Sequence, residues 1–130
     1  MEDVDFSDDF CRFLQASVPG VDAAELLLLL QSQPERAFTP AEAVAALRAS
    51  VTLGEAEAAR HFAAFESAGL AARDAQGRVR YLPASELLAA RVQTLAKAYR
   101  ERPVTLIRVI YALRDKKIQS FADAFKMRRN

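Results

Sequence analysis

Four arginines lie close together between residues 60 and 80, and their guanidinium groups suit phosphates and the edges of guanine. They are Arg60, Arg73, Arg78 and Arg80. Arginine is the most frequent specific partner of guanine in the major groove of DNA, and it also binds phosphates in bidentate fashion. Side chains alternate along a strand, so Arg78 and Arg80 are expected on one face. Three or four such contacts would give a useful but salt-sensitive affinity for nucleic acid; an ordinary solvated hairpin is an equally weighted alternative.

Catalytic and metal chemistry have little support in the sequence. His61 is the only histidine and Cys11 the only cysteine, whereas a zinc site usually needs three or four ligands of this kind. Asp8 and Asp9 have no base or nucleophile nearby, which indicates a solubilising cluster at a helix start. We therefore expect no enzyme activity, no cofactor and no metal. His61 is expected on a helix flank or partly buried, and Cys11 as a small buried apolar residue.

The composition predicts one ordered, helix-rich domain with appended helices. The chain has 130 residues, of which 52% are hydrophobic, with no tryptophan. Its net charge of +1 is unevenly distributed. Residues 1–40 hold eight acids and two bases, residues 41–83 hold five of each, and residues 84–130 hold four acids and eleven bases. The acidic and basic ends could meet within one molecule or between subunits, or face different partners.

Targeting and membrane signals are not visible. The chain begins MEDVDFSDD, which is acidic where a signal peptide would be basic. The run Leu26–Leu30 is far shorter than the roughly 20 apolar residues that span a bilayer. We expect a cytoplasmic protein without membrane insertion.

Capping signals and apolar spacing predict four helices before residue 70. Ser7 caps the first helix, whose apolar residues are Phe6, Phe10, Phe13 and Leu14, and Pro19-Gly20 ends it. Asp22 is expected to cap the second helix, with Glu25 as its capping-box partner and an end near Gln33.

The third and fourth helices have similar signals. Arg36–Phe38 is expected to be a short strand. Thr39, Pro40 and Glu42 form a capping box with proline at the first helical position, and that helix ends near Ala49. Thr52 and Glu55 are expected to form the capping box of the fourth helix, which ends at a left-handed Gly69.

A hairpin and a long helical region follow. Leu70–Arg73 and Arg78–Leu82 are the expected strands, with Gly77 taking a positive φ in the turn between them. Ser85 opens a long helix, and Pro103 predicts a kink or a short break. Beyond it, a last amphipathic helix is expected around Ile118, Phe121 and Phe125.

The helix from Thr52 has one buried and one exposed face by helical geometry. With Ala58 at the centre of the buried face, Phe62 and Phe65 lie beside it. The opposite face comprises Leu53, Ala56, Glu57, Arg60, Ala63, Ala64 and Ser67. This face is small and has one strong candidate for reading bases, Arg60.

Three segments together resemble the winged-helix domains of bacterial regulators of the MarR and ArsR type. They are FTPAEAVAALRAS, ARHFAAFESAGLA and RDAQGRVRYLP. The likeness covers about half the chain. It implies a mainly α fold with a small β-hairpin, a winged helix-turn-helix over residues 21–83. An N-terminal helix over residues 1–20 precedes it, and C-terminal helices for dimerisation or docking follow over residues 84–130.

The resemblance also implies a function, a DNA-binding transcriptional regulator that acts as a homodimer without catalysis. Arg60 would read bases in double-stranded DNA, Thr52 and His61 would lie near the DNA backbone, and the arginines of the hairpin would contact phosphates. A winged-helix protein-interaction module with little DNA affinity is the alternative, favoured by the sparse basic face and the acidic N-terminus.

The expected dimer interface is a heptad seam on the C-terminal helices. Its residues are Leu88, Val92, Leu95, Tyr99, Leu106, Ile110, Phe121 and Phe125. Packing of this seam on the first helix of the same chain is the alternative. The basic segment 114–129 is expected to be an arm on a neighbouring subunit, with a docking helix for another protein, a membrane-surface helix or nonspecific DNA support as alternatives.

Overall fold

The computed structural model describes residues 6–128, with side chains described for residues 6–115. Within this range the chain is mainly helical, with one small antiparallel sheet, as the sequence predicted. The elements are α1 (Asp8–Ser17), α2 (Val21–Ser32), α3 (Pro40–Leu47), α4 (Glu55–Ser67), β1 (Ala71–Arg73), β2 (Val79–Tyr81), α5 (Glu86–Glu101) and α6 (Pro103–Arg128).

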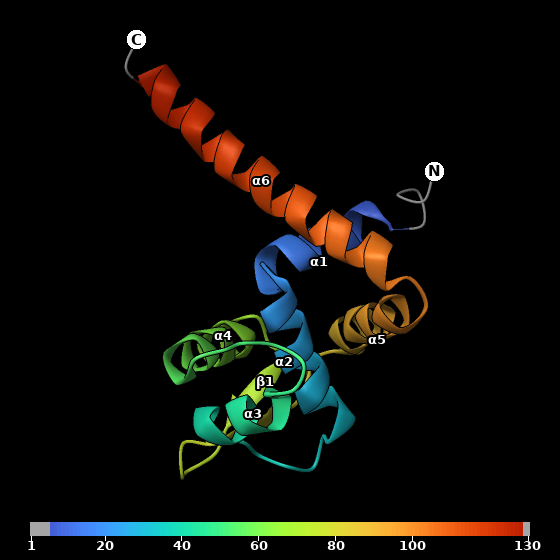
Figure 1. The fold of residues 1–130 in the computed structure, drawn as a ribbon, viewed down its shortest axis with the longest axis vertical. Helices are drawn as coiled ribbons and strands as arrows, with labels where there is room; N and C mark the ends of the chain where they lie inside the picture. The colour runs from blue at the N-terminus through green and yellow to red at the C-terminus, as the bar shows by residue number, and fades with distance from the viewer. Residues whose placement is uncertain (1–5, 129–130) are drawn as a thin grey trace.

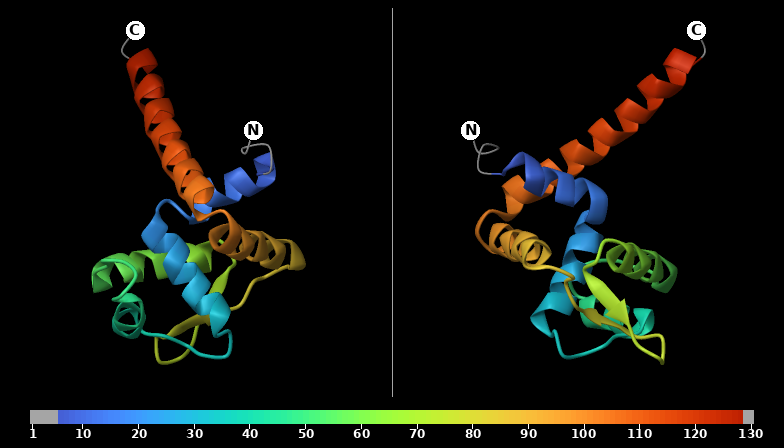
Figure 2. Two further views of the ribbon diagram at one scale, coloured as in Figure 1. Left: turned by 45° about the vertical axis from the view of Figure 1, so that its right-hand side comes forward. Right: turned by 180° about the vertical axis from the view of Figure 1, so that it is seen from behind.

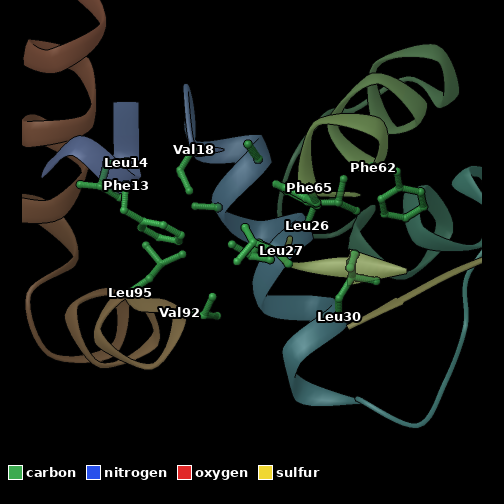
Figure 3. Close-up of a cluster of buried hydrophobic side chains, with 14 of the residues drawn as sticks. Phe13, Leu14, Val18, Leu26, Leu27, Leu30, Phe62, Phe65, Val92 and Leu95 are labelled. Carbon is green, nitrogen blue, oxygen red and sulfur yellow. The ribbon is translucent and has the colours of Figure 1, made fainter. Parts of the chain in front are cut away.

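Helix α2 lies at the centre of the core (Figure 1). It contacts α3, α4, α5 and β2, and the side chains of Leu26, Leu27 and Leu30 are completely buried. Leucines can therefore occupy several sides of α2, because neighbouring elements cover this helix on several sides. Figure 3 shows these leucines between Phe62 and Phe65 of α4 on one side and Val92 and Leu95 of α5 on the other. One core joins the three segments expected from the sequence.

Two of the four helix starts predicted before residue 70 are confirmed, and so is the later start at Ser85, whose hydroxyl oxygen accepts a hydrogen bond of 3.1 Å from the Leu88 N–H. The Ser7 hydroxyl oxygen accepts a hydrogen bond of 3.1 Å from the Phe10 N–H and so caps α1. At α3 the Glu42 N–H donates to Thr39 Oγ1 at 3.1 Å, and the Thr39 N–H donates to Glu42 Oε1 at 2.9 Å. Pro40 occupies the first position of that helix. These caps satisfy N–H groups that have no partner inside a helix.

The other two starts predicted before residue 70 are wrong. Helix α2 begins at Val21 after an extended Gly20, so Asp22 lies inside its first turn. Helix α4 begins at Glu55 after Gly54, and Leu53 before it is 7% exposed and packs in the core. Thr52 therefore lies outside the helix, and the Gly54 N–H donates to Glu57 Oε1 at 3.2 Å.

One rung of backbone hydrogen bonds joins the hairpin to Phe38, which lies just before the N-cap of α3. Strands β1 and β2 pair antiparallel, with Arg73 opposite Val79, and each is shorter than predicted. Phe38 exchanges two hydrogen bonds with Val79, of 2.8 and 2.9 Å, which confirms the predicted short strand before α3. Gly69 and Gly77 both have a φ of 80°, as expected for a helix end and a turn.

Within the residues whose side chains are described, the seam predicted as a dimer interface packs in the core of the same chain. Val92, Leu95 and Leu106 are 0% exposed and Ile110 is 2% exposed. They pack against α1 and α2, and Figure 3 shows Leu95 beside Phe13. Leu88 and Tyr99 are partly buried against the same core. The heptad spacing was correct, but its partner is the chain's own N-terminal region, which was the alternative prediction.

Helix α6 begins at Pro103 after a break at Arg102 and continues to Arg128. The expected break is confirmed, but the segment around Ile118 belongs to the same helix instead of a separate one. Past its contact with α1, α6 extends away from the rest of the molecule (Figures 1 and 2). Phe121 and Phe125 of the predicted seam lie outside the residues whose side chains are described.

None of the described helices, taken singly, is long and apolar enough to cross a bilayer, although α1 and α2 would qualify together, as a pair bent by 97°.

Candidate nucleic-acid interface

Helix α4 and the hairpin lie in the half of the molecule away from the C-terminal end of α6 (Figure 2). The buried side of α4 comprises Ala58, Phe62 and Phe65, all 0% exposed, as predicted. Its solvent-exposed residues are Glu55, Ala56, Glu57, Ala59, Arg60, Ala63, Ala64 and Ser67. Leu53 was expected on this face and is instead buried. The face is small and rich in alanine, so another molecule can approach the backbone closely.

Arg60 is exposed and borders an open cleft of about 440 Å³. The cleft is lined by Pro19, Gly20, Asp22, Glu57, Arg60, His61 and Arg114. Arg60 forms no ion pair or hydrogen bond among residues 6–115, so its guanidinium group is available to an external partner. Arg114 reaches the same cleft from α6, a proximity that local sequence spacing could not indicate.

His61 is partly buried at the edge of this cleft. Its Nε2 lies 3.2 Å from Oδ2 of Asp22, its side chain is 18% exposed, and its ring stacks on Phe65. The partial burial agrees with one sequence expectation. The expected contact with the DNA backbone does not fit this geometry, because the imidazole is engaged by α2. Thr52 is exposed but precedes α4, so it does not cap the helix that would enter the groove.

Two of the three hairpin arginines are held in ion pairs. Arg73 binds Glu66 of α4 through two hydrogen bonds, of 2.6 and 3.3 Å, and also donates to the Gly77 carbonyl at 3.1 Å. Arg78 Nε lies 3.3 Å from Oδ2 of Asp74. These contacts fix the hairpin against α4 and close its turn. Glu66 is a residue that the sequence analysis missed, since it is seven positions from its partner.

Asp74 organises the turn through its carboxylate. Its Oδ1 accepts hydrogen bonds of 2.9 Å from the N–H groups of both Gln76 and Arg78. The backbone hydrogen bond from Arg78 is the main cause of a pKa for Asp74 below its usual value. The turn therefore keeps a negative charge at its base, which partly offsets the neighbouring arginines.

Arg80 is exposed on β2, opposite Ala72 of β1. Val79 before it is buried, and Arg78 before that is exposed, so the predicted alternation holds. Within residues 6–115 Arg80 has no ion-pair partner. Arg60 and Arg80 are thus the two predicted site arginines without intramolecular partners in that range.

No protein-family model, curated protein or solved structure matches the chain. Over the described residues, no group of three or more histidine, cysteine, aspartate or glutamate side chains is placed to hold a metal ion. Cys11 is half-buried and packs against the core beside Val109 and Leu113 of α6.

Proposed function

We propose that the chain is a winged helix-turn-helix DNA-binding regulator that acts by binding and not by catalysis. In this proposal α2, α3 and α4 form the helical core of the domain, β1 and β2 form the wing, and Phe38 supplies the third strand position. Helix α4 would enter the major groove and the wing would contact phosphates or the minor groove. A regulator of this kind acts on DNA in the cytoplasm.

The observation that favours DNA most is the pair of exposed arginines without intramolecular partners, Arg60 on α4 and Arg80 on the hairpin. Arg60 stands among alanines, so its guanidinium group can approach a guanine edge without a bulky neighbour on that face. Arg80 can bind phosphate without first losing an ion pair. Arg73 and Arg78 would need to exchange Glu66 and Asp74 for phosphates.

Fluorescence polarisation with labelled genomic duplexes tests this proposal. Arg60→Ala should weaken binding to the preferred duplex by about 1–3 kcal/mol and relax its sequence preference. Arg80→Ala should weaken binding to all duplexes and lower the salt dependence by about one unit of slope. Arg12→Ala, on α1, is a matched control because Arg12 is an exposed arginine outside the proposed surface. Binding equal to that of random DNA at low salt would reject the proposal.

A protein-interaction module is the second candidate, and a specific observation favours it. The exposed face of α4 combines two glutamates with four alanines, and two hairpin arginines are neutralised by Glu66 and Asp74. Phosphates would be repelled by such glutamates, whereas a protein surface could pack on the alanines. Replacing Arg78 and Arg80 together with alanine should weaken DNA binding under the first proposal and leave binding of a protein partner unchanged under the second.

A further inference from the structure

The cleft beside Arg60 is formed by three parts of the chain that lie far apart in the sequence. The turn between α1 and α2 contributes Pro19 and Gly20, while α4 and α6 contribute one arginine each, Arg60 and Arg114. The volume of about 440 Å³ falls within the range of roughly 300–1,000 Å³ that is usual for small-molecule sites. The cleft therefore has room for a small ligand that several elements contact at once.

The two arginines of the cleft have no ion-pair partner within residues 6–115. Arg114 also lines a smaller cavity together with Val18 and Pro19, at the end of α1. An arginine can pack its methylene groups on apolar residues while its charged end stays in solvent, and the two contacts of Arg114 fit this arrangement. Both guanidinium groups are therefore available to a ligand in the cleft.

The two carboxylates that line the same cleft have partners within the chain. Glu57 Oε1 accepts a hydrogen bond of 3.2 Å from the Gly54 N–H, and Asp22 Oδ1 accepts one of 2.9 Å from the Ala23 N–H. The other carboxylate oxygen of Asp22 lies 3.2 Å from Nε2 of His61. The cleft thus offers a ligand two unpaired cationic groups, whereas its anionic groups already have neighbours that bind them.

We propose that this cleft binds the phosphate group of a small molecule, a phosphate monoester or a pyrophosphate, between Arg60 and Arg114. One guanidinium group can occupy both oxygens of a carboxylate, whereas a phosphate has enough oxygens to accept hydrogen bonds from two guanidinium groups at once. A phosphate monoester also has a charge of about −1.5 to −2 near pH 7, which matches two arginines. Arginines that reach one cleft from two different helices therefore favour phosphate over a carboxylate.

A phosphate in this cleft would occupy Arg60, which the proposed function assigns to DNA. The small phosphate and DNA should then compete, and each should weaken the binding of the other by the same factor. This consequence rests on the DNA-binding proposal, whereas the binding of phosphate does not.

Calorimetric titration of the full chain with sodium pyrophosphate, at constant ionic strength and without DNA, tests the site. The wild-type chain should bind pyrophosphate saturably and more tightly than acetate. Arg60→Ala and Arg114→Ala should each weaken binding at least about tenfold, because each removes charge-assisted hydrogen bonds. Arg108→Ala is the matched control, since Arg108 is exposed on α6 and does not line the cleft. It should bind pyrophosphate like the wild type, and all three variants should keep the wild-type circular dichroism.

Removal of a negative charge from the cleft should strengthen binding. Glu57→Gln keeps an oxygen that can accept the Gly54 N–H but has no charge. It should tighten pyrophosphate binding roughly threefold, because a like charge near the ligand is removed in water-exposed surroundings. Glu55→Gln, exposed in the same turn of α4 but outside the cleft, should have a smaller effect. Partial unfolding of a variant could not produce such a gain.

The titrations have outcomes that overturn the proposal. Wild-type protein that shows no saturable binding of pyrophosphate overturns it, and so does Arg114→Ala that binds as tightly as Arg108→Ala. If pyrophosphate does not bind but Arg114→Ala weakens the binding of duplex DNA, Arg114 contacts the DNA backbone and the proposed site is rejected. Saturable binding of pyrophosphate by a chain without preference for any duplex supports the site and rejects the DNA-binding proposal alone.

Discussion

The arginines of the candidate interface differ in whether DNA would have to displace an intramolecular carboxylate before binding them. Arg73 and Arg78 are ion-paired but remain 42% and 45% exposed. Exposed ion pairs are worth only about 0–1 kcal/mol, so a phosphate could displace Glu66 or Asp74 at a small cost. Arg60 and Arg80 need no such exchange. We therefore expect the affinity to depend first on the latter two residues.

Tyr99 forms the most unusual single contact, a hydrogen bond from its hydroxyl group to a carboxylate oxygen of Glu25. Burial, followed by the hydrogen bond and the charge of Glu25, raises the pKa of Tyr99 to about 12 from 10.0. The contact joins α5 to α2, next to the seam that packs on α1. Glu25 therefore acts across the core and not as the helix cap that its spacing suggested.

Tyr99→Phe should destabilise the protein by about 1 kcal/mol at pH 8, because Glu25 loses a hydrogen bond in a partly buried site. A raised pKa in the folded state gives stability that is present below pH 10 and is lost as pH rises toward 12. The difference between wild type and Tyr99→Phe should therefore shrink above pH 10. Urea unfolding followed by circular dichroism measures it.

Tyr111→Phe is the control for this experiment, since Tyr111 is exposed. Burial also raises the pKa of Tyr81, so only the difference between variants reports on Tyr99. An unchanged difference from pH 8 to pH 12 would contradict the assigned cause.

Helix starts show which elements could be predicted from sequence. The capping box of α3 is confirmed because Thr39, Pro40 and Glu42 are local determinants and nothing distant competes with them. The start at Thr52 failed because the cap lies two residues later, where the Gly54 N–H donates to Glu57 and not to Glu55. Asp22 failed as a cap because α2 begins one residue earlier, at Val21 after Gly20. Glu25 instead accepts a hydrogen bond from the hydroxyl group of Tyr99, far along the chain.

Replacement of Gly69, at the end of α4, can be compared with replacement of Gly77 for its effect on stability. Gly69 donates to the Glu66 carbonyl and Leu70 to the Phe65 carbonyl, an arrangement that needs the positive φ of Gly69. A Cβ there would lie 3.3 Å from Leu88 Cδ1 and 3.4 Å from Ala84 Cβ, whereas one at Gly77 meets nothing within 4 Å. Gly77→Ala should cost about 1–2 kcal/mol from backbone strain alone, and Gly69→Ala at least as much.

Thermal and urea unfolding of both variants would measure this difference. A Gly69→Ala protein as stable as wild type would show that the left-handed helix end is not required.

At the scale of the whole molecule, one core unites the N-terminal helix, the central helices and the C-terminal pair. Leu95→Ala should therefore destabilise the folded chain by about 2–5 kcal/mol, as for other large-to-small changes in a core. Leu87→Ala, at a 61% exposed residue of the same helix, should change stability by less than about 0.5 kcal/mol. Denaturant unfolding at several protein concentrations measures both.

Measuring Leu95→Ala at several protein concentrations distinguishes packing within one chain from packing between chains. If the decrease in unfolding free energy is the same at all concentrations, the buried seam packs within one chain. If the decrease disappears at high concentration, packing between chains is favoured. Periodicity in the sequence could predict the seam because spacing is a local property. It could not predict the partner, because Val92 and Leu95 have the same spacing whether they face α1 or a second copy.

The rung between Phe38 and Val79 also has a consequence for the edges of the sheet. It places β2 between two neighbours, with β1 on one side and Phe38 on the other. The outer edges left by this order are three residues and one residue long, over the described part of the chain. Edges this short offer too few unpaired backbone groups to template an added strand. Association by strand addition is thereby disfavoured, so recognition of other molecules would depend on side chains and not on backbone pairing at an edge of the sheet.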